Sequence, residues 1–238
     1  MKPRFYSLWA ISAPLDEGEL CSQLNLMRGW GFDGAVFHPR FYPDEPPYLS
    51  DRYFAILSQV ILYAKSIGME FWLYDENGWP SGTVGGKMLE HHPDDVQQWA
   101  ELVTEQPPDC LSSLEYGGQR WYVALRRGTG VDYLSSNLAR HFLEMTHDRY
   151  RQALVPAAFD HVTTFFCDEP EFGLGHAYEE LSPHGAIPWT PRLPELFQQR
   201  HGENLVELLP LLFLQGDGYR ETRVQFWELL TDLFCESF

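Results

Sequence analysis

Short runs of apolar residues alternate with longer amphipathic segments along the first third of the chain. Phe5–Ile11, Gly34–His38 and Met69–Tyr74 are apolar or aromatic runs with the length of buried strands. Between them, Leu15–Trp30 and Tyr53–Ile67 carry apolar residues at helical spacing. Strands and helices that alternate at these lengths predict right-handed βαβ units and a parallel sheet.

The predicted helices also carry boundary signals. Asp16 and Glu17 stand at the start of the first helix, where acidic side chains are favoured. Ser50 or Asp51 caps the second helix, and Gly68 ends it. These signals place both helices independently of their hydrophobic pattern.

The pattern changes after the third predicted strand. Trp99–Leu125 contains alternating segments around the turn Tyr116-Gly117-Gly118, which predicts a β-hairpin inserted after that strand, within a β-rich insertion of residues 91–130. The pattern after this insertion predicts a long amphipathic helix over Val131–Leu154 and a fourth strand over His161–Cys167. It then predicts a loop rich in Gly and Pro over residues 170–194 and two helices, Leu193–Arg200 and Thr222–Phe238.

The fourth predicted strand ends abruptly in two carboxylates and a proline. Its apolar run, Val162–Cys167, suits a strand that is covered on both faces, and Pro170 ends it because proline has no amide to donate. A carboxylate at the C-terminal tip of a parallel strand lies where α/β proteins place their chemistry. The alternative is that Asp168 caps the next segment, with Pro170 in its first turn.

Three of the predicted strands end in polar or charged side chains, which a parallel sheet would bring to one rim. Paired carboxylates at a cleft can serve as acid and as base or nucleophile in glycoside hydrolysis. The loop after the third strand adds an indole that can stack on a sugar ring. The candidate residues are His38 and Arg40 after the second strand, Asp75, Glu76 and Trp79 after the third, and Asp168 and Glu169 after the fourth.

Each candidate has a structural alternative. Asp75 can cap the segment that follows, Trp79 can fill the core, and Arg40 can pair with Asp44 or Glu45. The glycines of residues 82–86 resemble a phosphate-binding loop, but the segment contains neither the G-x-x-x-x-G-K-[ST] motif nor the G-x-G-x-x-G motif. Nucleotide binding is therefore disfavoured.

The sequence predicts no metal site. The segment His91-His92 with Asp94 and Asp95 could bind a metal, but its spacing matches no known ligand set, so surface residues at a helix start are the favoured interpretation. The carboxylates at the strand tips could hold Ca²⁺, which takes six to eight oxygen ligands.

Composition narrows the classes of partner. The 238 residues carry a net charge of −17, which disfavours nucleic acid and anionic membranes as partners. No stretch has the length and apolarity of a membrane span, and the N-terminus lacks the apolar core of a signal peptide, so a cytoplasmic location is expected. The four cysteines are far apart and form no C-x-x-C pair, which predicts reduced thiols.

Four segments carry a resemblance to a known family: VFHPR, FWLYDENGWPSGTVGG, VDYLSSNLARHFLEMTHDRY and FFCDEP. They resemble the barrel domain of bacterial glycoside-hydrolase-like proteins related to the α-L-rhamnosidases of glycoside hydrolase family 106. The resemblance runs from about Phe5 to the C-terminus, and D-E-x-x-W-P-S-G and D-E-P are its most specific pieces.

The resemblance implies roles for the last of these motifs. DEP is similar to the Asn-Glu-Pro that ends strand four in the clan of retaining barrel glycosidases, which implies that Glu169 is the acid/base. Asp168 departs from the clan's Asn, which contacts the sugar 2-hydroxyl. The second catalytic carboxylate is expected on a later strand, which the pattern here does not contain. Relatives of this family also use calcium, but the resemblance gives no ligand set for it.

We therefore expect an α/β fold of the (β/α)8 TIM-barrel type in a single domain, residues 1–238, that supplies only the N-terminal part of a barrel. A closed barrel takes about 250 residues, and the last segment is still helical. The open sheet edges of a half barrel predict that the chain forms a homodimer or aggregates. The expected function is hydrolysis of a glycosidic bond, with Glu169 as general acid and the other six strand-end residues binding carbohydrate. The alternatives are a non-catalytic carbohydrate-binding protein and a barrel fragment with no function of its own.

Overall fold

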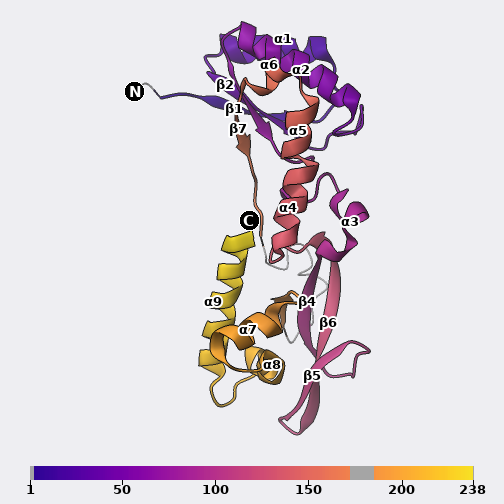
Figure 1. The fold of residues 1–238 in the computed structure, drawn as a ribbon, viewed down its shortest axis with the longest axis vertical. Helices are drawn as coiled ribbons and strands as arrows, with labels where there is room; N and C mark the ends of the chain where they lie inside the picture. The colour runs from indigo at the N-terminus through magenta and orange to yellow at the C-terminus, as the bar shows by residue number, and fades with distance from the viewer. Residues whose placement is uncertain (1–2, 172–184, 238) are drawn as a thin grey trace. The chain divides into compact units, whose positions relative to one another are not determined.

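The computed structural model describes residues 3–171 and 185–237, and the chain in it divides into two compact units (Figure 1). Unit 1 consists of Met1–His91 and Arg140–Pro170, and unit 2 of His92–Ala139 and Glu171–Phe238. The chain therefore passes between the units three times. Each unit is a layered arrangement of one sheet with helices, so the protein is a mixed α/β protein.

Unit 1 is built on a four-stranded parallel sheet. Its strands are β1 (Tyr6–Ile11), β2 (Gly34–Pro39), β3 (Glu70–Tyr74) and β7 (Val162–Phe166), and they lie side by side in that order. In the register of the sheet, the last residue of β3 lies opposite the last residue of β7. The carboxyl ends of the neighbouring strands consequently meet at one edge of the sheet, as the alternating pattern predicts.

Helices cover one face of this sheet (Figure 1). They are α1 (Glu17–Gly29), α2 (Asp51–Ser66), α5 (His147–Ala153) and α6 (Pro156–Phe159). The short α3 (Met88–His91) follows the loop after β3. The predicted caps are confirmed: Asp16 Oδ1 accepts the Glu19 amide at 2.8 Å, and Ser50 Oγ accepts the Tyr53 amide at 3.3 Å. Side-chain capping of this kind fixes where each helix begins.

Aromatic rings fill the core between the sheet and α2. The ring of Phe37 on β2 contacts Trp9 on β1, Phe71 on β3 and Tyr53 on α2, with centroid separations of 5.6, 6.0 and 6.5 Å. Successive strand residues point to opposite faces, so Leu8 lies on the other face of the sheet. There its side chain is 58% exposed.

In the residues that the structure describes, unit 2 combines an antiparallel sheet with helices that pack against it. The strands lie in the order β5 (Cys110–Tyr116), β6 (Gln119–Val131), β4 (Val96–Val103) and β8 (Ala186–Trp189). An apolar core joins them to α7 (Leu193–His201), α8 (Leu205–Phe213) and α9 (Tyr219–Ser237). The predicted hairpin around Tyr116-Gly117-Gly118 is confirmed as β5 and β6, although β4 also pairs with β6.

The long helix predicted for Val131–Leu154 is confirmed only in part. Val131 ends β6, and the helical part is divided into α4 (Ser136–Met145) and α5 at Thr146, whose φ of −115° and ψ of −79° deviate from ideal helical values within the right-handed region. The Thr146 hydroxyl donates to the Phe142 carbonyl at 2.5 Å. A threonine that bonds the preceding turn distorts a helix without changing its hydrophobic period.

Three further predictions need correction. Burial of the fourth strand on both faces is wrong, because β7 is an edge strand of the described sheet and its residues are half-buried or exposed. The loop predicted for residues 170–194 contains β8, which pairs with β4; residues 172–184 lie outside the described part. Helix α8 was not predicted, because its Pro210 is a residue that ordinarily ends a helix.

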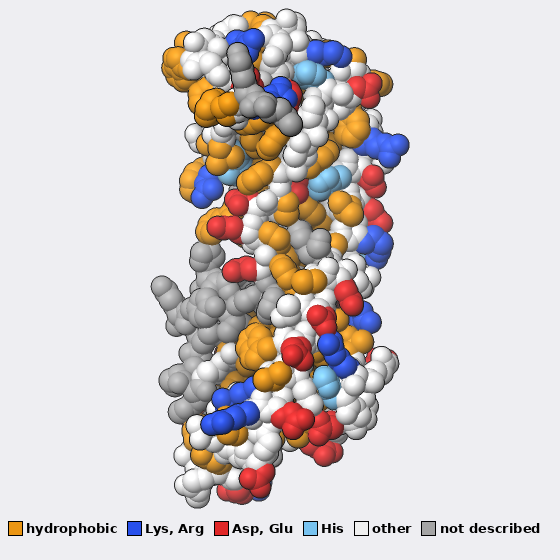
Figure 2. Space-filling model, turned by 90° about the vertical axis from the view of Figure 1, so that its left-hand side faces the viewer, with side chains coloured by type: hydrophobic (Ala, Val, Ile, Leu, Met, Phe, Trp, Pro, Cys, Tyr) orange, Lys and Arg blue, Asp and Glu red, His pale blue; other side chains and the backbone are white. Residues whose placement is uncertain are grey.

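Acidic side chains are spread over the surface of the protein. Asp and Glu side chains lie over both units on the face drawn in Figure 2, in keeping with the net charge of −17. Within residues 3–171 and 185–237, none of the helices combines the length and the apolarity that crossing a membrane requires.

Candidate functional site

The loop after β3 joins the carboxyl ends of three strands in unit 1. The Gly78 amide donates to the Pro39 carbonyl at the end of β2, at 3.0 Å. The Asp75 amide donates to the Phe166 carbonyl at the end of β7, at 3.2 Å. The strand-end residues predicted from the sequence therefore come together in one unit.

The side chain of Trp79 contacts residues that follow two other strands of the sheet. Its indole Nε1–H donates a hydrogen bond to Glu169 Oε2, and the Arg40 guanidinium lies 5.7 Å from its ring centroid. The Trp79 side chain is 42% exposed, so the alternative that it fills the core is wrong. An exposed ring, a cation and an exposed carboxylate consequently form one surface cluster.

Glu76 organises the loop that carries Trp79. Its carboxylate is completely buried and accepts five backbone amides, those of Asn77, Gly82, Thr83, Val84 and Gly85. Gly82, Val84 and Gly85 have positive φ, which turns consecutive amides toward one point. Burial raises the pKa of Glu76, and the amide bonds oppose that shift. The role in sugar binding predicted for Glu76 stays a prediction, but its oxygens already hold the loop together.

Asp75 is a second buried carboxylate beside this loop. It is 2% exposed, and burial raises its pKa to about 7, with the neighbouring charges of Glu76 and Asp168 acting in the same direction. Ser81 Oγ–H donates to Asp75 Oδ1 at 2.6 Å. His147 Nε2 lies 3.7 Å from Asp75 Oδ2, and burial lowers the pKa of this histidine. Asp75 is therefore held in place as a carboxyl that titrates near neutral pH.

His38 lies beneath the same cluster. It is 1% exposed and stands edge-on to the Tyr74 ring, at a centroid distance of 3.9 Å. Neither of its ring nitrogens has a hydrogen-bond partner with acceptable geometry among the described residues, although the Gly78 backbone lies close to it. Burial, then the charge of Arg40, lowers the pKa of the ring, so it is neutral at pH 7.

Three residues of the cluster were not singled out from the sequence. Ser81 belongs to the W-P-S-G segment, in which the sequence pattern assigned possible roles only to the Trp and Gly residues. Tyr74 was counted as a strand residue, and its hydroxyl is buried beside Asp168. His147 follows the unpredicted break at Thr146. The position of Ser81 inside the motif was the available signal; the other two carry none in the local pattern.

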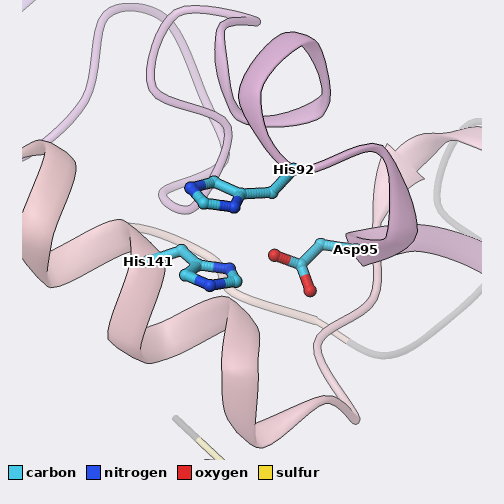
Figure 3. Close-up of side chains that lie close together, drawn as sticks. All are labelled: His92, Asp95 and His141. Carbon is cyan, nitrogen blue, oxygen red and sulfur yellow. The ribbon is translucent and has the colours of Figure 1, made fainter.

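The histidines considered as metal ligands lie elsewhere. In unit 2, His92 precedes the 3-10 turn η1 (Pro93–Asp95) and Asp95 is its last residue, with potential ligand atoms of the two residues within 4.8 Å of each other (Figure 3). His141, also labelled there, is a residue of α4 in unit 1, where its Nε2 accepts from Arg140. Two ligands from unit 2 fall short of the four that a structural zinc takes. Calcium stays a prediction of the family resemblance.

Comparison with known proteins adds a likeness of fold. No family model matches the chain, and no curated protein matches it in sequence. A rhamnosidase from Novosphingobium sp. PP1Y is similar in structure, with a TM-score of 0.61 and 10% sequence identity. The match covers 99% of this chain and 44% of that one, so this chain spans less than half the length of the rhamnosidase. At this identity, the similarity is one of fold alone.

Proposed function

We propose that the strand ends of unit 1 form a carbohydrate site of the glycoside-hydrolase type, with Glu169 as the general acid. The observation that carries this proposal is the hydrogen bond between the exposed Trp79 indole and the exposed Glu169 carboxylate. Ring stacking on an indole and proton transfer from a carboxyl are both required of a site that cleaves sugars. The fold likeness to a rhamnosidase supports the same class.

The geometry of Glu169 suits proton donation. Its Oε2 accepts the indole N–H, and its Oε1 is the oxygen that can carry a proton to the departing glycosidic oxygen. When the proton leaves, the carboxylate that remains keeps the indole bond, which stabilises the developing negative charge. Trp79 therefore supports the step in which Glu169 becomes charged.

Three of the other strand-end residues bind the sugar in this proposal, and the buried ones support them. Trp79 offers its exposed ring face, Arg40 lies over the same ring, and Asp168 is a half-buried carboxylate at the end of β7. Asp75 and His38 are buried below them and shape the floor of the site. Glu76 contributes indirectly, because its carboxylate accepts the backbone amides of the loop that carries Trp79.

We further propose that the sheet of unit 1 corresponds to the first four strands of a (β/α)8 barrel. Its strands are all parallel and neighbours in chain order, the arrangement that a barrel requires. The rhamnosidase similarity, which spans 44% of the larger chain, supports this assignment.

A non-catalytic carbohydrate-binding function is the second candidate. Hydrolysis needs a second carboxylate beside the acid. Asp75 and Glu76 are 2% and 0% exposed, so neither carboxylate is placed to contact a bound sugar as nucleophile or base. This observation favours binding without cleavage by the residues described.

Hydrolysis of alkyl and nitrophenyl glycosides, α-L-rhamnosides among them, distinguishes the candidates. Glu169→Gln should lose about 10²–10⁴-fold in rate on an alkyl glycoside. It should lose less on a nitrophenyl glycoside, whose leaving group needs no proton. Glu171→Gln, at an exposed carboxylate two residues on, is the matched control. Full activity of Glu169→Gln on alkyl glycosides overturns the acid assignment; sugar binding without cleavage by the wild type favours the second candidate.

A further inference from the structure

Ser81 holds the backbone of the residue before Glu169. Ser81 is wholly buried; its amide donates to the Asp168 carbonyl, and its Oγ accepts the Asp168 amide, both at 3.0 Å. The Ser81 hydroxyl proton is directed to Asp75 Oδ1, at 2.6 Å. One serine thus engages both backbone groups of Asp168 and the buried carboxyl of Asp75.

The backbone at Glu169 depends on this kind of support. Glu169 has a φ of +49°, in the left-handed region that side chains other than glycine rarely adopt. Such a conformation persists where the surrounding structure enforces it. Two hydrogen bonds from residues 79–81 restrain this backbone. Ser81 Oγ accepts the Asp168 amide, and the Trp79 indole donates to the Glu169 carboxylate.

We propose that Ser81 is a positioning residue that couples the protonation of Asp75 to the position of Glu169. A charged Asp75 can only accept, so it fixes the Ser81 hydroxyl as a donor, and the Ser81 oxygen accepts the Asp168 amide. The side chains of Tyr74 and Cys167 also interact with Ser81. A protonated Asp75 can itself donate to Ser81 Oγ, which then gains a further donor that competes with the Asp168 amide. The hydrogen bonds that hold Asp168 therefore differ between the two states.

Asp75 is a buried group beside this serine, and burial raises its pKa to about 7. The titratable side chains that face it are Glu76, Cys167, Asp168, His147 and the tyrosines Tyr48, Tyr74 and Tyr150. Burial raises the pKa of Cys167 to about 11 and the pKa of each tyrosine as well, so these groups are neutral at pH 7. Burial also lowers the pKa of His147, which is then uncharged. Burial raises the pKa of Glu76, and the hydrogen bonds from the backbone amides oppose that shift.

The test observes the Trp79 indole N–H by ¹H–¹⁵N NMR of the full chain, without any sugar. The chain has 8 tryptophans, and loss of one indole resonance in Trp79→Phe assigns the signal. Because this N–H bonds Glu169, its chemical shift reports the position of that carboxylate. In the wild type, the resonance should titrate with a midpoint near pH 7.

The variants separate coupling through Ser81 from a direct effect of charge. The titration should disappear in Asp75→Asn and in Ser81→Ala. It should remain in Ser58→Ala, a buried serine of the same unit whose Oγ accepts the Val155 amide at 3.2 Å. A flat wild-type resonance, or an unchanged titration in Ser81→Ala, overturns the proposal. If Ser81→Ala does not fold, Ser81→Thr, which keeps the hydroxyl, should retain the titration, and a flat Ser81→Thr resonance counts against it.

The inference rests on the proposed function only for its meaning in catalysis. The NMR titration succeeds or fails without hydrolysis, so its failure is distinct from a failure of the glycosidase proposal. If both hold, the rate of sugar cleavage should follow the protonation of Asp75, and Ser81→Ala should lower kcat more than it changes KM.

Discussion

The indole Nε1–H of Trp79 donates to Glu169 Oε2 across 90 residues of sequence. Trp79 belongs to the loop after β3, and Glu169 follows β7, so one hydrogen bond joins the ends of two neighbouring strands. Arg40, just beyond β2, lies over the same ring. Polar groups from three strand ends are therefore gathered at a single indole.

Asp75 should make the stability of the protein depend on pH. Its pKa is about 7 in the folded state, against about 4 in an unfolded chain. Between these values, the folded state holds a proton that the unfolded state releases, so the free energy of unfolding falls as pH rises. The decrease amounts to about 4 kcal/mol at most, three pKa units at about 1.4 kcal/mol each. Urea unfolding at a series of pH values measures it.

A second buried carboxylate separates the contribution of Asp75 from that of other groups. Burial raises the pKa of Asp132 in unit 2 to about 6. Asp132→Asn should therefore keep the decrease between pH 6 and 7, and Asp75→Asn should remove it. Loss of that decrease in Asp132→Asn, or its survival in Asp75→Asn, would contradict the assignment.

Replacing Glu76 should loosen the loop that carries Trp79 and Ser81. Glu76→Gln puts an amide group where one carboxylate oxygen accepts backbone N–H groups, and some of those donors lose their partner. A buried donor without a partner costs about 1–3 kcal/mol, and more where a charged group was involved. We expect a loss of about 2–4 kcal/mol in urea unfolding and faster hydrogen exchange at the amides of Thr83 and Val84.

Glu70 is the matched control for Glu76. It stands at the other end of β3, is partly exposed, and accepts the Tyr6 hydroxyl at 2.7 Å. Glu70→Gln should lower the free energy of unfolding by less than about 1 kcal/mol, because the ion pair of Glu70 with Arg4 is partly exposed and such pairs contribute little. Equal losses for the two variants would show that Glu76 does not organise its loop.

Gly34 leaves space for a stacked pair of rings on the sheet. Tyr6 and Trp72 stack at a centroid distance of 4.5 Å, and a Cβ at Gly34 would lie 2.7 Å from Tyr6 Cδ1 and from the Glu70 carbonyl oxygen. Gly34→Ala should therefore lower the melting temperature by several degrees. Gly29→Ala, whose Cβ meets nothing within 4 Å in α1, should leave it unchanged or raise it. Equal effects would exclude the steric explanation.

The sequence predicted the elements of unit 1 well because their signals are local. Apolar runs such as Gly34–His38 and caps such as Asp16 and Ser50 depend on a few neighbouring residues, and the structure confirms them. The rim of polar strand ends followed from the parallel order of the strands. The helix break at Thr146 was missed because it leaves the hydrophobic period intact.

The inner arrangement of the candidate site is set by distant contacts that no local pattern shows. Ser81 meets Asp168 across 87 residues, and the five amides around Glu76 converge through φ angles that include the positive φ of Val84. Composition alone could not tell a half-exposed edge strand such as β7 from a buried one. Carboxylate-rich strand ends could thus be located from sequence, whereas the roles of the individual carboxylates could not.

The division of unit 1 into two separate segments has a consequence for its synthesis on the ribosome. β3 pairs with β7, and roughly ninety residues separate these strands in the chain. At a translation rate of about 5–20 residues per second, β1, β2 and β3 leave the ribosome several seconds before β7 does. A nascent chain that stops before Val162 contains Asp75 and Trp79 but no Glu169. The indole-to-carboxylate bond is consequently among the last contacts of unit 1 that a growing chain can make.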